Sequence, residues 1–199
     1  MRKVFSSLWF KCICVLLSIA LVSGGLLAVL NDVLNVSAEE RTMRAVKKIY
    51  GEEKTYSVVI DADSEDSGKN QAVVCGDFGT IEKIFIIGDE NSDNFDYLFK
   101  ATGAHGYKNG TISLWIRVSF KSGETKIEKV ILDSFTKQTL MSKLGSDFYD
   151  GFNGDADGKY YYAEKKDGAN YSPVTGATKS ATAANNAVNC VIFWLRGNA

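Results

Sequence analysis

The stretch ISLWIRVSF (residues 112–120) and the stretch KIEKVIL (residues 126–132), joined around Ser122-Gly123-Glu124, give the clearest signal for the fold. Both stretches are rich in β-branched and aromatic side chains, which favour strands. The short polar link with a glycine between them is typical of a tight turn. The sequence therefore predicts a β-hairpin at these residues.

Similar runs lie on both sides of this hairpin and predict further strands. Gly, Asn, Asp and Ser separate the runs, and this spacing favours antiparallel pairing. The predicted strands are residues 56–60, 71–75, 81–87, 111–120, 126–132 and, as a last short strand, 160–163.

Two segments in the second half of the chain have the spacing of amphipathic helices. Residues 137–152 are predicted to form helical turns with an apolar stripe of Leu140, Met141, Leu144, Phe148 and Phe152. Residues 177–195 are predicted as a C-terminal helix with an apolar face of Ala184, Ala187, Val188, Val191, Ile192 and Leu195. Lys179, Asn185 and Asn189 are expected elsewhere on that helix. Together these elements predict an α+β domain of antiparallel strands packed with helices.

An uninterrupted apolar run at residues 12–30 precedes this domain. At a rise of ~1.5 Å per residue the run spans about 29 Å, which matches the hydrocarbon thickness of a bilayer. Basic residues precede the run and acidic residues follow it, a bias that keeps the N-terminus in the cytoplasm. The alternative, a cleaved signal peptide, places its cut near Val36-Ser37-Ala38, well beyond the apolar run.

These features predict a single-pass protein of the cell membrane. We expect residues 1–11 to be cytoplasmic, residues 12–30 to form a transmembrane helix and residues 31–50 to form a juxtamembrane helix. Residues 51–199 are then expected to form one extracytoplasmic domain.

Composition limits the partners and the chemistry of that domain. Beyond the first thirty residues the chain holds 20 basic and 24 acidic side chains, a net charge of −4. It lacks the basic stripe that nucleic acids require, so no nucleic-acid partner is expected.

Cys75 and Cys190 are expected to be buried free thiols, with a disulfide as the open alternative. His105 is the only histidine, and no Ser-His-Asp order or metal-ligand cysteine spacing is found, so no catalytic residue is predicted.

The segment PVTGATKS, residues 173–180, opens the predicted C-terminal helix. The free backbone N–H groups and the positive dipole end of a helix start favour a phosphate, and Gly176 leaves room for close approach. Thr178 adds a hydroxyl within reach of a phosphorus atom held there. Thr and Ser at a helix start are also ordinary caps, so the residues alone leave both interpretations open.

With the anchor and the small outer domain, the box Thr175-Gly176-Ala177-Thr178 resembles the FMN-binding domain family. That family includes the covalent flavoproteins of the Rnf electron-transport complex and of the sodium-pumping NADH:quinone oxidoreductase. Residues 106–110 (GYKNG) are similar to the family's Gly-Tyr-x-Gly turn, and residues 138–143 (QTLMSK) stand where relatives have Glu-Thr-Pro-Gly. Where the family usually has an acidic residue before the box, this chain has Ser172.

The resemblance implies a covalent flavin. In the family a flavin transferase joins FMN through its phosphate to the last threonine of the box, which is Thr178 here, and Thr175, Gly176 and Ala177 match the preceding positions. The isoalloxazine ring is expected near Thr139, as a hydrogen-bond donor, and near apolar or aromatic walls from Tyr107, Leu140 and Met141.

The implied function is electron transfer. The chain would be a flavoprotein subunit of a membrane-bound, Rnf-type ion-translocating oxidoreductase, in which the redox chemistry belongs to FMN. Its expected partners are other membrane subunits of that complex, the flavin transferase and the lipid bilayer.

A competing pattern lies at residues 153–164. Asn153, Asp155, Asp157 and Glu164 reproduce the oxygen-ligand spacing of a calcium loop, with Gly158 at the sixth place. The tyrosines at 160–162 favour a strand where such a loop would enter a second helix. The alternative function is thus an anchored extracytoplasmic binding module without flavin, with calcium as its candidate stabilising ion.

Overall fold

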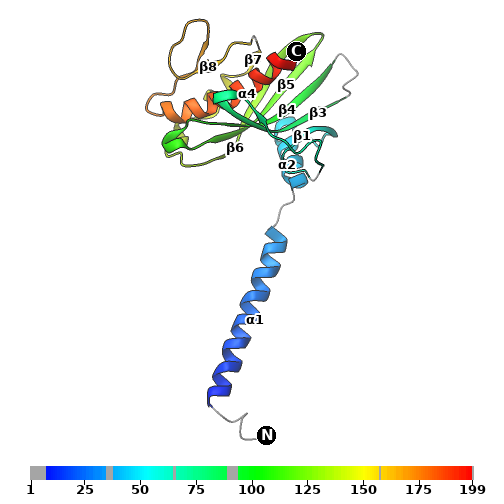
Figure 1. Cartoon of the computed structure of the whole chain (residues 1–199), viewed down its shortest axis with the longest axis vertical. Helices are drawn as coiled ribbons and strands as arrows, with labels where there is room; N and C mark the ends of the chain where they lie inside the picture. Colours follow the sequence, from blue (N-terminus) through cyan, green and yellow to red (C-terminus); the bar gives the residue numbers. More distant parts are fainter. Residues whose placement is uncertain (1–7, 35–37, 65, 89–93, 157, 199) are drawn as a thin grey trace. The chain divides into compact units, whose positions relative to one another are not determined.

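The computed structural model describes residues 8–34, 38–64, 66–88, 94–156 and 158–198, in two compact units. The first unit, Met1–Thr42, contains helix α1 (Leu8–Leu34). The part of α1 from Trp9 to Leu30 is long and apolar enough to cross a membrane. The structure thus contains the candidate N-terminal membrane helix that the apolar run predicts (Figure 1).

The second unit, Met43–Ala199, is built on an antiparallel sheet, as expected for the α+β class. Among the described residues the sheet has seven strands in the order β1-β3-β4-β5-β6-β7, and β2 also pairs with β3. These strands are β1 (Tyr56–Asp61), β2 (Val73–Val74), β3 (Gly79–Ile87), β4 (Asn94–Gly103), β5 (Ile112–Lys121), β6 (Glu124–Phe135) and β7 (Gly154–Asp155). Strands β8 (Tyr161–Tyr162) and β9 (Asn170–Tyr171) form a separate parallel pair.

The predicted hairpin is confirmed as β5 and β6. Lys121 pairs with Glu124 across the turn. The two residues between them, Ser122 and Gly123, have φ values of 51° and 85°. Two successive positive φ values define the turn type whose twist matches that of paired strands, which fixes the register of the hairpin.

Strand β4 is absent from the sequence-based expectation although it lies between β3 and β5. Its sequence mixes apolar residues with charges, which weakens the strand pattern. The charges have partners on the neighbouring strands: Asp96 Oδ2 accepts a hydrogen bond of 2.8 Å from Arg117, and Lys100 Nζ lies 2.9 Å from Glu82. The sheet therefore supplies the ion pairs that make a charged central strand tolerable.

The prediction for residues 137–152 is only partly right. The structure has a 3-10 turn, η3 (Met141–Lys143), and a short helix, α3 (Ser146–Asp150). Gly145 between them is extended, with ψ −179°, and interrupts the helix. Leu144 and Phe152 of the expected stripe are buried, whereas Leu140 is 41% exposed.

Two helices cover opposite faces of the sheet. In β5, Leu114 and Ile116 point to the face that is packed against α4 (Thr178–Asn198), and Trp115 between them belongs to a second cluster. That second cluster contains Val46 of α2 (Ala38–Tyr50). Because successive side chains of a strand point to opposite faces, α4 and the end of α2 sandwich the sheet.

Helix α4 is buried more fully than its apolar face predicts. Asn186 and Asn189 are 7% and 0% exposed, which corrects the expectation that Asn189 lies away from the core. Asn186 Nδ2 donates to the carbonyl of Ala104 at 2.9 Å. The amide of Asn189 donates to the carbonyl of Tyr161 at 2.9 Å and accepts its N–H at 2.7 Å. These asparagines tie chain segments to the helix instead of facing solvent.

Candidate functional site

The Thr-Gly-Ala-Thr box forms the start of α4. Gly176 adopts a φ of 74°, and Ala177 donates its N–H to the carbonyl of Val174 at 3.0 Å. Ala177 is 4% exposed, whereas Thr175 and Thr178 are exposed. The turn at Gly176 therefore buries the alanine and leaves the Thr178 side chain at the surface, as the first residue of the helix.

Gln138 joins two other segments to this first turn. Its Oε1 accepts hydrogen bonds from the N–H of Tyr107 at 3.1 Å and from the hydroxyl of Ser180 at 2.9 Å. Its Nε2 donates to the carbonyl of Thr136 at 3.0 Å. Gln138 is 8% exposed, so these bonds are made in the interior. The segments around residues 107 and 138, far apart in the sequence, are thus held against the start of α4.

The same two segments contain unusual backbone conformations. Among the described residues, His105, Lys108, Asn109 and Lys137 are non-glycine residues with φ between 51° and 64°. Such conformations cost free energy and persist where the surrounding structure imposes them, often at functional sites. The hydrogen bonds of Gln138 are one source of that constraint.

The predicted ring-binding residues lie close to this turn. Tyr107 is 39% exposed at the start of η2 (Tyr107–Asn109), Leu140 is 41% exposed and Thr139 is exposed. Met141 is half-buried against the core. Through Gln138 the structure thus holds the segments of these residues near the first turn of α4, and most of them are surface groups.

Lys143 is a further residue at this place that sequence reasoning missed. Its Nζ lies 2.6 Å from the position that a Cβ on Gly176 would occupy. The ammonium group therefore lies next to Gly176, close to the helix start. A single lysine in a short loop has no sequence pattern that would have identified it.

The described residues of the calcium pattern lie in and around two short strands. Asn153 precedes β7, Asp155 lies in β7 and pairs with Lys126, and Glu164 follows β8. Asp157 lies outside the described residues. In the part of the chain that the structure describes, no three His, Cys, Asp or Glu side chains are grouped as metal ligands.

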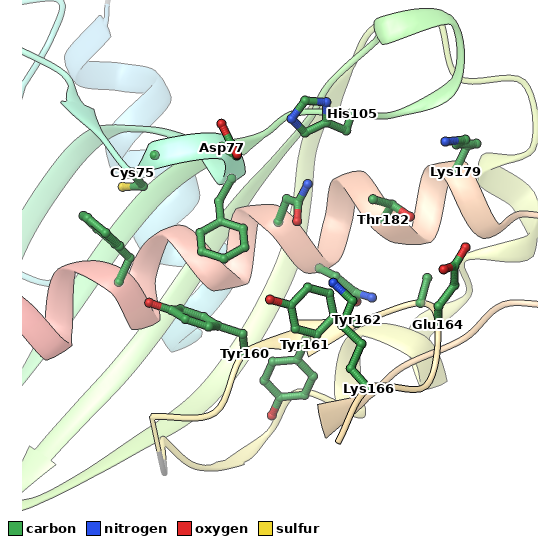
Figure 2. Close-up of a pocket in the computed structure, with 16 residues that line it drawn as sticks. Cys75, Asp77, His105, Tyr160, Tyr161, Tyr162, Glu164, Lys166, Lys179 and Thr182 are labelled. Carbon is green, nitrogen blue, oxygen red and sulfur yellow. The ribbon is translucent and has the colours of Figure 1, made fainter. Parts of the chain in front are cut away.

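A groove of about 580 Å³ runs along another side of α4, and sequence reasoning missed it (Figure 2). One wall is η1 (Gly76–Phe78) with Cys75 and His105, and the other is residues 160–164 with Lys166. Its floor is the α4 residues Lys179, Thr182, Asn185, Asn186 and Phe193. We call this the α4 groove. The run of tyrosines at 160–162 is the one signal for it in the sequence, and on its own that run predicts only a strand.

The two ends of the α4 groove differ in character. Glu164 and Lys179 lie toward the start of α4 in Figure 2. At the other end the rings of Phe78 and Tyr160 pack with centroids 4.7 Å apart. One end therefore has an acidic and a basic side chain, and the other has aromatic rings together with the carboxylate of Asp77.

Cys75 and Cys190 are free, buried and next to each other. Both are 0% exposed. A hydrogen bond between the thiols lowers the pKa of Cys75, and the same bond, with burial, raises the pKa of Cys190. The expectation of two buried free thiols agrees with this structure.

Comparison of the chain with family models, with curated proteins and with solved structures finds no match in any of the three. The interpretation of the site therefore depends on its own geometry and on the sequence.

Proposed function

We propose that the chain is a membrane-anchored electron-transfer flavoprotein that carries FMN through a phosphoester on Thr178. One observation supports this most: Gln138 holds the Tyr107 loop and the loop of residues 139–141 against the helix start that exposes Thr178. Three segments implied by the family resemblance are thus neighbours in the fold.

The helix start suits a phosphate group. The first-turn N–H groups of α4 have no partner within the helix and favour an anion. Gly176 adopts the positive φ of the turn before the helix, and the Lys143 ammonium lies next to it. The residues therefore fit the phosphate of FMN: Thr178 would supply the ester oxygen, and Lys143 and the helix dipole would balance the remaining negative charge.

The flavin would supply the redox chemistry, and the protein would hold the ring and select its partners. Leu140 and Tyr107 are exposed side chains on the segments that Gln138 ties to the start of α4, and they are suited to contact a ring at the surface. A surface position allows electrons to pass to another protein at short range. We therefore place the chain in a membrane complex of the Rnf type, with other membrane subunits as its redox partners and a flavin transferase as its modifying enzyme.

The anchor is consistent with this assignment. The proposed topology has α1 across the cell membrane with the N-terminus in the cytoplasm, and it rests on the charge bias around the apolar run. A reporter enzyme that works only outside the cytoplasm should be active when it is fused to the C-terminus. Activity of a second reporter, one that works only in the cytoplasm, at the same position would overturn the topology.

The attachment is tested by co-expression of the full chain with a flavin transferase and in-gel flavin fluorescence after denaturation. The wild-type band should fluoresce, and Thr178→Ala should not. Thr175→Ala is the matched control, because it removes a hydroxyl from the same exposed turn and should leave some attachment at Thr178. Fluorescence retained in Thr178→Ala would move the attachment to another residue.

A second candidate function, an anchored binding module without flavin, is favoured by the α4 groove. Its volume of about 580 Å³ lies within the range of small-molecule sites. Unmodified protein after co-expression with the transferase would favour this function over the first.

A further inference from the structure

Three segments around the start of α4 contain basic side chains and no acidic ones. The segments are residues 104–111, 136–145 and 172–183. Their lysines are Lys108, Lys137, Lys143 and Lys179. Beyond its first thirty residues the chain has a net charge of −4, so acidic side chains are in excess elsewhere in the domain. The three segments are separate in the sequence, and the positive charge is concentrated only where the fold brings them together.

Two of the lysines lie at one loop. Gly106 donates its N–H to the carbonyl of Gly110 at 2.9 Å, which closes the loop that carries Lys108. The Cβ of Lys137 lies 2.9 Å from the position that a Cβ on Gly110 would occupy. Lys137 therefore adjoins the same loop as Lys108.

The other two lysines lie at the first turn of α4. The Nζ of Lys143 lies 2.6 Å from the position of a Cβ on Gly176, directly before the helix. Lys179 is the second residue of the helix. Gln138 bonds the loop of residues 106–110 to Ser180 of this turn. The four lysines are thus held around one helix start.

The positive charge of these lysines is not neutralised by the protein. All four side chains are exposed, and within the described ranges none of them has an ion-pair partner. Glu164 lies at the same end of the α4 groove as Lys179 (Figure 2). The phosphodiester of an attached FMN would add one further negative charge. The four ammonium groups exceed these two negative charges, so an attached flavin does not account for the whole basic cluster.

Apolar side chains lie among these charges. Tyr107 is 39% exposed and Leu140 is 41% exposed, and both belong to the same segments as the lysines. Exposed apolar groups with a polar rim are typical of surfaces that bind another protein. We call Tyr107, Leu140 and the four lysines the basic surface.

The arrangement favours a protein partner over a lipid surface. Anionic lipids are bound by runs of Lys and Arg next to a membrane span. The lysines of the basic surface instead come from three segments, and the interior bonds of Gln138 fix two of these segments against the third. A fixed pattern of charges fits a partner whose acidic groups are also fixed in space.

We propose that the basic surface docks an acidic face of a partner protein beside Thr178. Opposite charges steer such partners together and set their orientation, and salt weakens the attraction. The docking itself does not require a flavin. The role of the partner as an electron carrier, however, rests on the proposed function.

Photo-crosslinking in the membranes of the cell that makes this protein tests the docking. The full chain carries a photoreactive amino acid in place of Ser142, which is exposed and precedes Lys143. Illumination should give a covalent adduct with a protein, and peptide mass spectrometry should locate the bond in a partner peptide of net negative charge. No adduct, an adduct with lipid alone, or a partner peptide without an acidic excess would overturn the proposal.

Charge reversal shows whether the lysines make the contact. The test variant combines Lys108→Glu, Lys137→Glu and Lys179→Glu, and it leaves Lys143 in place because that lysine adjoins the proposed attachment site. The adduct yield should fall by about tenfold, the sum of three modest exposed ion pairs. An undiminished yield would overturn the proposal.

A matched control reverses the same amount of charge elsewhere. It combines Lys69→Glu, Lys121→Glu and Lys126→Glu at exposed lysines outside the three segments. This control should stay within about twofold of the wild type. An equal loss in both variants would make the effect one of overall charge and would overturn the docking at this surface.

Salt provides a test that needs no charge-reversal variant. Between about 0.1 M and about 1 M salt the screening length falls from ~10 Å to ~3 Å, so the yield of the adduct should fall by at least about fivefold. A yield that is unchanged at high salt would contradict docking through charge.

The Thr178→Ala variant separates this proposal from the covalent flavin. The adduct should form in Thr178→Ala as in the wild type, because the basic surface is complete without the flavin. Loss of the adduct in Thr178→Ala would make the flavin itself the contact and would overturn docking through the lysines. An adduct in a wild-type chain that carries no flavin would support the docking and refute the proposed function, and a covalent flavin without an adduct would do the reverse.

Discussion

Replacement of Gln138 by leucine should both destabilise the outer domain and disconnect its candidate site. Gln138 makes three hydrogen bonds in the interior, two through Oε1 with Tyr107 and Ser180 and one through Nε2 with the carbonyl of Thr136. Leucine has a similar size but leaves these three partners without their bonds. At about 1 kcal/mol for each lost bond, the free energy of unfolding should fall by about 3 kcal/mol.

Gln138→Glu is the matched control for this change. It keeps an oxygen that can accept from Tyr107 and Ser180. We expect a loss of about 1 kcal/mol or less at a pH low enough to keep this buried carboxyl protonated, and a larger loss at neutral pH, where an unpaired carboxylate would be buried next to the carbonyl of Thr136. The difference between the two variants isolates the link between the Tyr107 loop and α4.

The assay is urea-induced unfolding of the full chain in detergent, followed by tryptophan fluorescence, in wild type and both variants. Covalent flavin after co-expression with the transferase is measured in parallel, and Gln138→Leu should reduce it more than Gln138→Glu. If the free energy of unfolding of Gln138→Leu lies within about 0.5 kcal/mol of the wild-type value, the hydrogen bonds of Gln138 do not stabilise the site, and the reasoning fails.

Three further predictions concern the framework of the domain. Gly103→Ala should destabilise it by more than about 2 kcal/mol in urea unfolding, because a Cβ at this position would overlap the backbone of α4. Lys83 is buried, which disfavours its charge, but its bonds to Asp61 and a second aspartate outweigh burial and raise its pKa. Because the folded pKa lies above the unfolded value, this stabilisation is present below about pH 10 and is lost as the pH rises through the folded pKa. Between about pH 9 and pH 12 the free energy of unfolding should therefore fall less in Lys83→Met than in the wild type. Cys75 and Cys190 should resist a thiol reagent in the folded protein and react in urea, and rapid labelling of either in the native state would contradict their burial.

The elements that local sequence determines were predictable. The hairpin of β5 and β6 has strand-forming residues on both sides of a Gly123 turn, and α4 has apolar residues at helical spacing from Ala184 to Leu195. Strand β4 was missed because its charges are acceptable only with Arg117 and Glu82 in place, and those partners come from the assembled sheet. Long-range pairing of this kind leaves no local pattern.

The candidate site was predictable to a similar degree. Thr178 could be placed at a helix start from its own neighbours. The contact of Lys143 with Gly176 and the burial of Asn185 could not be inferred, because each depends on how distant segments pack. An asparagine on a helix is usually assigned to its polar face, and only the tertiary structure shows this one in the interior.

The central claim is the covalent flavin on Thr178, and the mass of the protein tests it most directly. The full chain, co-expressed with a flavin transferase, is measured intact, digested and mapped by peptide mass spectrometry. We predict an added mass of FMN less water, located on the peptide that contains Thr178. An unmodified mass, or a flavin located on a different peptide, would contradict the account.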